Sequence, residues 1–222
     1  LELLTDIVTT TGEQQLKSFD IYVVSNNGTF KIEGCVITQG EFQLGKDNPL
    51  TLTVSGQGKK LSRVGDENFS LPGNLQSASA TRTPTIPLLD VLVSNSAVSN
   101  LVTATLQVQN NIEWTPYETL QNSLSVTNAT NAMYPSDYSL SDRNVSGNIT
   151  QFHSDANASE FQTFNTSTSV QIRTKVNGSI FFNANLADCM YTKRSNAGEV
   201  FTQTYDFRLV GTPNDLGNQI TY

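Results

Sequence analysis

Residues 101–120 read Leu-Val-Thr-Ala-Thr-Leu-Gln-Val-Gln-Asn-Asn-Ile-Glu-Trp-Thr-Pro-Tyr-Glu-Thr-Leu, and residues 141–152 read Ser-Asp-Arg-Asn-Val-Ser-Gly-Asn-Ile-Thr-Gln-Phe. In the first stretch Leu106 and Val108 alternate with polar residues, which is the period of a strand with one buried face. The second stretch has the same period, and we expect its strand to start near Arg143. The two stretches together predict neighbouring β-strands and an all-β fold.

The composition favours a protein that meets other proteins. The chain has 222 residues, of which 15% are charged, well below the roughly 25% of ordinary soluble domains. An uncharged polar surface is typical of protein interfaces, where charge is depleted at the centre. Extracellular and capsid-type β-proteins share this composition, so composition alone leaves both classes open.

The charge argues against tight nucleic-acid binding. The formal net charge is −7, whereas proteins that grip phosphates do so with clustered lysines and arginines. Adjacent basic residues occur only at Lys59-Lys60 and Lys193-Arg194. We also expect no membrane partner, because no apolar stretch is long enough to cross a bilayer and the start shows no secretory pattern. The chain begins with Leu1 rather than Met, which leaves open whether residue 1 is the translation start.

We predict a single domain over residues 1–222. Residues 19–56 have the alternation of a four-stranded antiparallel meander, with a hairpin turn at Asn26-Asn27-Gly28. Residues 62–87 are rich in Pro, Gly and Ser and predict a long loop or arm. Strands resume within 88–211, among them 88–93 and 103–112, and a flanking α-helix is expected at 155–166.

No enzyme chemistry is indicated, and we expect no catalytic, cofactor-binding or metal-binding residues. His153 is the single histidine, and at a strand end we interpret it as a structural hydrogen-bonding group. Together with Cys35 and Cys189 it lacks the spacing of zinc ligands. We interpret the two cysteines as free, buried thiols. The glycines at 56 and 58 indicate a bend in a strand rather than a phosphate loop.

The pattern of a strand ending in Asn-Asn-Ile, a loop, and then Arg-Asn-Val-Ser-Gly-Asn-Ile-Thr resembles the tail tube proteins of long-tailed, siphophage-like bacteriophages. The resemblance extends over residues 16–58 and 100–211. It implies an antiparallel β-sandwich with one flanking helix. It also implies a structural virion protein, the major tail tube subunit, whose hexameric rings stack and whose sheets join into an inner β-barrel.

The resemblance further implies a conduit for DNA ejection in the virion tail, assembled in the cytoplasm of a bacterial host. The expected partners are copies of the chain and other tail proteins: tape measure, tail terminator and distal tail protein. DNA would pass without specific binding, which an acidic, polar lumen permits by repulsion. Alternation within the meander nominates the lumen-facing residues Glu41, Gln43, Thr51 and Thr53.

Two other functions compete with this one. An extracellular carbohydrate-binding or adhesin-type β-sandwich could use the aromatic side chains of Trp114, Tyr117, Tyr134 and Tyr138 to stack on sugars. The same residues could equally anchor their loop to the core. A capsid or decoration protein is the third possibility.

Overall fold

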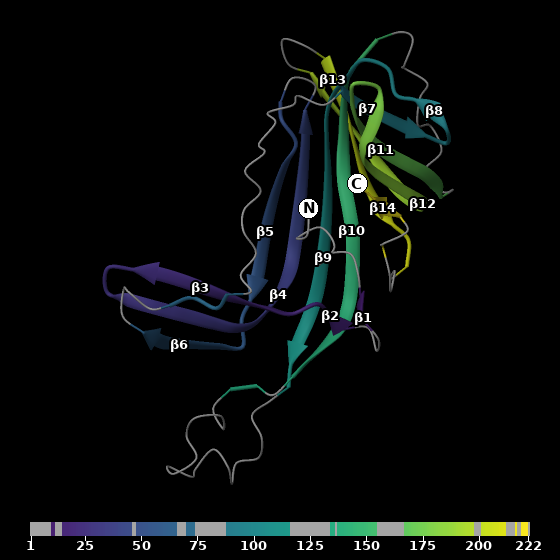
Figure 1. Ribbon diagram of the computed structural model, residues 1–222. Helices are drawn as coiled ribbons and strands as arrows, with labels where there is room; N and C mark the ends of the chain where they lie inside the picture. The colour runs from purple at the N-terminus through teal and green to yellow at the C-terminus, as the bar shows by residue number, and fades with distance from the viewer. Residues whose placement is uncertain are drawn as a thin grey trace.

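The structure is a computed structural model that describes residues 10–11, 15–45, 48–65, 70–73, 88–115, 134–135, 137–154, 167–197, 201–211, 216 and 219–221 (Figure 1). It is all-β, as predicted, and its described residues include no helix. The strands are β1 (Thr10–Thr11), β2 (Gln15–Leu16), β3 (Phe19–Ser25), β4 (Gly28–Gly45), β5 (Thr51–Gln57), β6 (Lys60–Gly65), β7 (Leu88–Val93), β8 (Ser96–Ala97), β9 (Leu101–Trp114), β10 (Tyr138–Phe152), β11 (Thr168–Val176), β12 (Ser179–Ala197), β13 (Phe201–Leu209) and β14 (Ile220–Thr221).

Twelve of these strands form one antiparallel sheet in the order β3-β4-β9-β10-β13-β12-β11-β7-β8, with β5 and β6 paired to β4 and β14 paired to β12. The resemblance to tail tube proteins implied a sandwich. The structure has one open antiparallel sheet that folds back on itself, so that its two packed layers are continuous with each other. We call β5, β9, β10, β13 and the second halves of β4 and β12 the first layer. The second layer comprises β7, β8, β11, β14 and the first half of β12.

Strand β12 joins the layers because it changes partners along its length. Its residues up to Cys189 pair with β11, and those from Cys189 onward pair with β13. This is how a strand makes the corner of a packed sheet. The layers meet through a single apolar core, in which the rings of Phe42 in β4 and Phe182 in β12 lie 5.0 Å apart. Burial of such aromatic side chains is the main force that holds the layers together.

Strand β4 also changes partners, and here the prediction was wrong. The meander was expected to have four strands, but its second and third merge into the 18-residue β4. The first half of β4 pairs with β3 and β6, and the second half pairs with β5 and β9. The first half, with β3 and β6, forms an arm that projects from the body past β5 (Figure 1). The predicted glycine bend is confirmed, because β5 ends at Gln57 and β6 begins at Lys60.

Two hairpin turns contain Asn followed by Gly, and the first of them, at Asn26-Asn27-Gly28, was predicted. Ser25 pairs with Gly28 across Asn26 and Asn27, which closes the first hairpin. Asn177 and Gly178, which connect β11 to β12, have φ values of 50° and 83°. Two consecutive positive φ values match the twist of the flanking strands.

Strand β10 begins earlier than predicted, at Tyr138 rather than near Arg143. Arg143 is fully buried in the body of the strand. Its Nε donates to Oδ1 of Asn110 at 2.7 Å, and Nδ2 of Asn110 donates to the carbonyl of Ile37 at 3.1 Å. These two hydrogen bonds link β10, β9 and β4. The bond to Asn110 also offsets part of the cost of burying the Arg143 charge, since a buried charge is tolerated only where it is hydrogen-bonded.

The expected loop at 62–87 starts too early, because β6 continues to Gly65. Residues 66–69 and 74–87, and the helix expected at 155–166, lie outside the described residues. Cys35 and Cys189 are free and buried, as predicted. No helix in the described part of the chain is long and apolar enough to cross a membrane.

Candidate functional site

The outer side of the first layer is a continuous polar surface, which we call the polar face. All four residues nominated from the sequence lie on it. Glu41 stands opposite Thr53, and Gln43 stands opposite Thr51, across the β4–β5 pair. Directly opposed residues of an antiparallel pair project to the same side of the sheet. The structure therefore brings the four side chains together.

The polar face is produced by the same alternation that builds the core. In β4 the intervening residues Phe42 and Leu44 are 2% and 3% exposed, and both belong to the core cluster. Because side chains in a strand alternate between sides, burying these two turns Glu41 and Gln43 outward. The core thus fixes which residues form the surface.

The polar face extends beyond the nominated residues across three further strands. Strand pairing places β9 beside β4, β10 beside β9, and β13 beside β10. On these strands the residues in register with the nominated ones are also polar: Thr105, Gln107, Ser146, Asn148, Asp206 and Arg208. Sequence reasoning did not include them. Their alternation was visible, but nothing local showed that these strands are neighbours of β4.

The polar face contains one close ion pair among its described residues, and Arg208 on the same face contacts the Asn144 side-chain oxygen at 3.4 Å. Arg194 of β12 holds Asp206 with two contacts, Nε to Oδ2 at 2.6 Å and Nη2 to Oδ1 at 2.8 Å. Asp206 thereby raises the pKa of the exposed Arg194 guanidinium. The amide of Gln43 donates to Oε1 of Glu41 at 3.0 Å. The paired arginine is less available to a passing polyanion than a lone cation would be.

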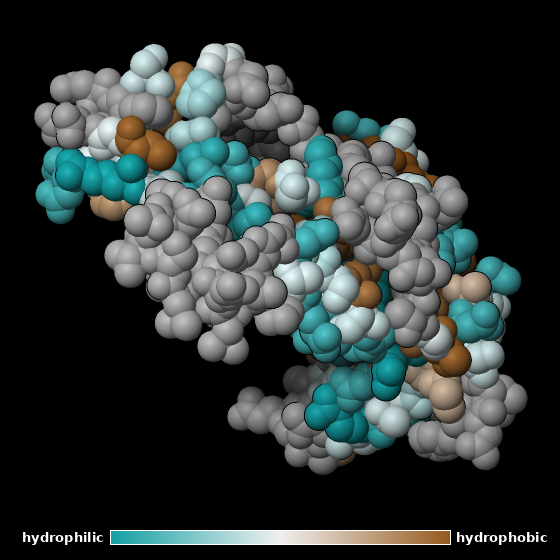
Figure 2. Space-filling view, turned by 90° about the horizontal axis from the view of Figure 1, so that it is seen from below, coloured by the Kyte–Doolittle hydropathy of each residue, from teal (hydrophilic) through white to brown (hydrophobic). Residues whose placement is uncertain are grey.

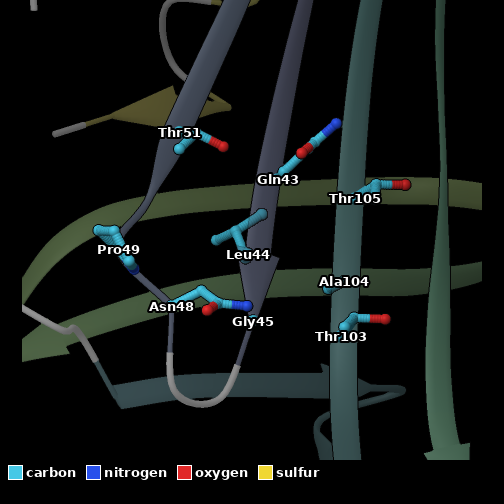
Figure 3. Close-up of a pocket in the computed structure, with 9 residues that line it drawn as sticks. All are labelled: Gln43, Leu44, Gly45, Asn48, Pro49, Thr51, Thr103, Ala104 and Thr105. Atoms are coloured by element: carbon cyan, nitrogen blue, oxygen red, sulfur yellow. The ribbon is translucent and has the colours of Figure 1, made fainter.

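Figure 3 shows a shallow hollow of about 410 Å³ at the end of β4, β5 and β9. Its lining includes Gln43, Thr51, Thr103 and Thr105, and strands of the second layer cross behind it. Its described lining residues carry hydroxyl, amide and apolar side chains, and none of them is acidic, basic or a thiol. Nor do the described residues contain a cluster of three or more side chains able to hold a metal ion.

A second hollow, of about 310 Å³, brings Glu41 and Asp206 to one part of the polar face. Paired carboxylates can serve glycoside hydrolysis, where one of them must be a raised-pKa acid. Here Asp206 is occupied by Arg194 and Glu41 is hydrogen-bonded by Gln43. The arrangement is that of a surface hydrogen-bond network.

His153 follows the end of β10, and its Nδ1 is in hydrogen-bond contact with the side-chain amide of Gln203. The Tyr205 hydroxyl donates to Oε1 of Gln203 at 2.6 Å, and Gln151 donates to the same hydroxyl at 3.2 Å. The histidine is thus part of a structural network, as the sequence predicted.

Three of the four aromatic residues considered for sugar stacking, Trp114, Tyr134 and Tyr138, contact other side chains of the protein. Trp114 and Tyr138 pack edge to face with ring centroids 5.5 Å apart, and the indole donates to Oε1 of Gln57 at 2.8 Å. The Tyr138 hydroxyl donates to the carbonyl of Leu16. These contacts favour the anchoring role. Tyr117 lies outside the described residues.

Comparison with known proteins identifies the family. The chain matches the Bacteriophage Baseplate Tube Protein Family over residues 7–221, and it therefore belongs to that family. No curated protein matches the chain. The match confirms the expectation of a structural bacteriophage tail protein, and the family is generally non-enzymatic. It points to the tube at the baseplate, and not specifically to the major tail tube of a siphophage.

Proposed function

We propose that this baseplate tube protein is the subunit of a ring in which the first layers of successive copies join edge to edge and the polar face lines the channel. The number of copies, six, comes from the resemblance to tail tube proteins. Stacked on other rings, this ring forms part of the conduit for DNA ejection. One observation carries the proposal. The polar face is broad, consists mostly of uncharged polar side chains, and extends over a sheet whose two edge strands, β5 and the second half of β12, have open edges.

The two edges are suited to each other. The first layer has six strands in the order β5-β4-β9-β10-β13-β12, and every pair is antiparallel. With an even number of alternating strands, β5 and β12 run in opposite directions. A copy related by rotation would therefore present β12 antiparallel to β5. In the described part of the chain no strand pairs with the outer edge of β5 or of β12 residues 192–197. Such edges invite pairing.

The chemistry of the polar face suits a sliding polyanion. Lysines and arginines that contact phosphates bind DNA strongly and in a salt-dependent way, which would retard its passage. Thr, Ser, Gln and Asn side chains offer no such attraction, and Arg194 is paired with Asp206. Arg208, which contacts Asn144, is the remaining arginine among the residues named on this face. A net charge of −7 on each copy adds repulsion around the ring. We propose Glu41, Gln43, Thr51 and Thr53 as lumen-facing residues on this basis.

The family membership supports a place in the virion tail and contacts with other tail and baseplate proteins. We extend this to a tape measure protein inside the tube and to tail terminator and distal tail proteins at its ends, with assembly in the host cytoplasm.

Disulfide trapping between copies tests the ring. Thr53→Cys and Thr192→Cys lie on opposite edges of the six-stranded layer, about 24 Å apart within one chain at the usual strand spacing of about 4.8 Å. They can therefore bond only between copies. Under oxidation, the double variant is expected to give covalent multimers of the chain, up to a closed ring. The native Cys35 and Cys189 are buried and should not interfere.

The matched control replaces Thr192→Cys by Asn185→Cys, which is exposed in the first half of β12 within the second layer. It should give no multimers. Sedimentation of the wild-type protein at tens of micromolar, alone and with a baseplate hub, tests assembly directly. Monomer alone under both conditions would contradict the proposal. So would an assembled ring whose inner surface is ringed by lysines and arginines other than Arg194 and Arg208 of the polar face.

A further inference from the structure

The arm has two faces of opposite character. Strand pairing aligns Ile21 with Ile32 and Leu61, and aligns Val23 with Phe30, beside which Arg63 of β6 lies in register. We call the face that the five apolar residues share the apolar arm face. The other face carries Val24 and Tyr22 together with charged and polar side chains, and there Lys31 Nζ contacts Asp20 at 2.9 Å and Glu33 at 3.3 Å.

The apolar arm face is exposed to solvent, although apolar side chains on one side of a sheet are usually covered by a second layer. Ile21, Val23 and Leu61 are 40%, 46% and 61% exposed. None of the five residues belongs to the core cluster or packs against it. In Figure 2 apolar side chains, in brown, reach the surface of the arm at the left beside polar ones in teal. Contiguous apolar surface on one side of a small sheet is typical of an interaction site.

The direction of the arm is built into the bend. Gly34 has a φ of +60°, and its amide donates to Oδ1 of Asp20 at 3.0 Å. The amide of Lys59 donates to the carbonyl of Glu33 at 2.8 Å. At Gly58 an added Cβ would lie 2.3 Å from the Ile32 side chain, so the turn is closely packed. These three contacts fix the bend between the arm and the first layer, and the bend fixes the direction in which the apolar arm face points.

We infer that the apolar arm face docks on the next copy of this chain in the ring. The inference rests on the proposed function. Strand β4 runs without interruption from the first layer into the arm, and the arm passes beyond the β5 edge (Figure 1). A copy joined at that edge therefore stands beside the arm. Its contact with the apolar arm face continues the strand interface, while the charged face of the arm remains in water.

Two neighbouring valines make a matched test. Val23→Ser changes the apolar arm face, and Val24→Ser changes the opposite face of the same strand, where Val24 pairs with Thr29. The two side chains are similarly exposed, at 46% and 51%, so both variants lose the same β-branched side chain from the same strand. We expect Val23→Ser to raise the concentration at half-assembly about tenfold, because a half-buried valine is removed from an interface. Val24→Ser should leave it within about twofold.

The outcomes separate the two proposals. If the wild-type protein stays monomeric, the proposed function and the docking both fail. If it assembles and the two variants assemble equally well, only the docking is overturned.

Thiol labelling gives a second measurement that does not depend on the valine variants. Leu61→Cys lies on the apolar arm face and Ser62→Cys on the other face. With a maleimide probe, Leu61→Cys should react in the isolated subunit and be protected in the ring, whereas Ser62→Cys should react in both. Equal labelling of Leu61→Cys in both states overturns the docking. Protection already in the isolated subunit also overturns it, because the occupant is then another segment of the same chain.

Discussion

Strands β4 and β12 have 18 and 19 residues, and each changes partners next to a buried cysteine. In β12 the change at Cys189 folds the sheet back, so that Phe182 and Leu186 meet the first layer and become buried. In β4 the change near Cys35 turns the chain outward, and the apolar arm face stays exposed. The same feature, a change of partners within a long strand, therefore has two results. In β12 it closes the core of the subunit, and in β4 it leaves an apolar surface exposed.

This difference shows that a bend in a long strand does not by itself determine whether the apolar side of the strand becomes buried. What matters is whether a second layer of the same chain lies opposite the apolar side. Where it does, the bend contributes to the stability of the subunit. Where it does not, the bend contributes to assembly, because apolar area removed from water is stabilising wherever its partner comes from.

The largest expected effect is at the closed bend. Phe182→Ala removes a side chain that is 1% exposed and contacts Phe42, so it should lower the free energy of unfolding by about 3–5 kcal/mol. Urea titration followed by circular dichroism measures this loss. Phe30→Ala, on the half-buried arm, is the control and should cost less than half as much. Equal losses would show that the arm is as tightly packed as the core.

Hydrogen exchange should divide the molecule in the same way. Amides of β9 and β10, which are flanked by strands on both sides, should exchange only on global unfolding. Amides of β3 and β6 in the arm should exchange at least about a hundredfold faster by local opening. Mass spectrometry of the isolated subunit measures both. Uniform protection across the arm and the body would mean that they unfold as one unit, and it would contradict the expected difference in their local stability.

The two cysteines report on the bends separately. Burial raises the pKa of Cys189 to about 12, and burial with the nearby Asp20 charge raises that of Cys35. Because the thiolate is the reactive form, both should resist alkylation at pH 8 in the folded protein. In graded urea, Cys35 should react before Cys189. Simultaneous reaction would mean that the arm does not open first.

The raised pKa of Cys189 also predicts a pH dependence. The folded protein holds the neutral thiol, so this contribution to stability is complete below the ordinary thiol pKa of 9.0 and is lost as pH rises toward about 12. Cys189→Ala should remove that part of the alkaline decline in the free energy of unfolding. An unchanged decline would assign it to other groups.

The smallest effects are expected at two carboxylates, one in each region. In the second layer Asp90 meets Arg173 and, at 2.9 Å, Lys175. Burial opposes ionisation of Asp90, but the two cations outweigh it and lower its pKa. Its contribution is therefore present above pH 3.8 and lost as the pH falls further. Asp90→Asn should cost about 1 kcal/mol at pH 7.

The more exposed Asp20 in the arm, whose side chain is 42% accessible, is the comparison for Asp90. Asp20→Asn should shift the melting temperature less than Asp90→Asn does, since water screens its contact with Lys31. Differential scanning calorimetry at pH 7 and pH 3 measures both variants. A larger shift for Asp20→Asn would place more of the stability in the arm than the structure indicates.

Much of the strand content followed from local sequence. Phe207 and Leu209 alternate with Asp206 and Arg208, and a period of two predicts a strand wherever it falls. The same reasoning nominated Glu41 and Gln43 for a surface, and both lie on the polar face. The Asn-Gly turns were also local, because positive φ is a property of the residues themselves. The helix expected at 155–166 stays a prediction.

The partners of each strand were not predictable in this way. Cys35, Val36 and Ile37 are buried one after another and interrupt the alternation. The sequence between Gly28 and Gly45 therefore looked like two strands, when it is one that moves from the arm to the first layer. Arg143 had the right period for a core position but the wrong chemistry, and its burial depends on Asn110 from another strand.

The sequence by itself determined which side of each strand is apolar, since that depends on neighbours two residues apart. Only the tertiary structure decided that β9, β10 and β13 extend the surface begun by Glu41 and Gln43, and that the apolar side of β12 is covered while that of the arm is not. The physical reason is that backbone N–H and C=O groups are alike in every residue. They pair with whichever strand the packing of side chains brings beside them.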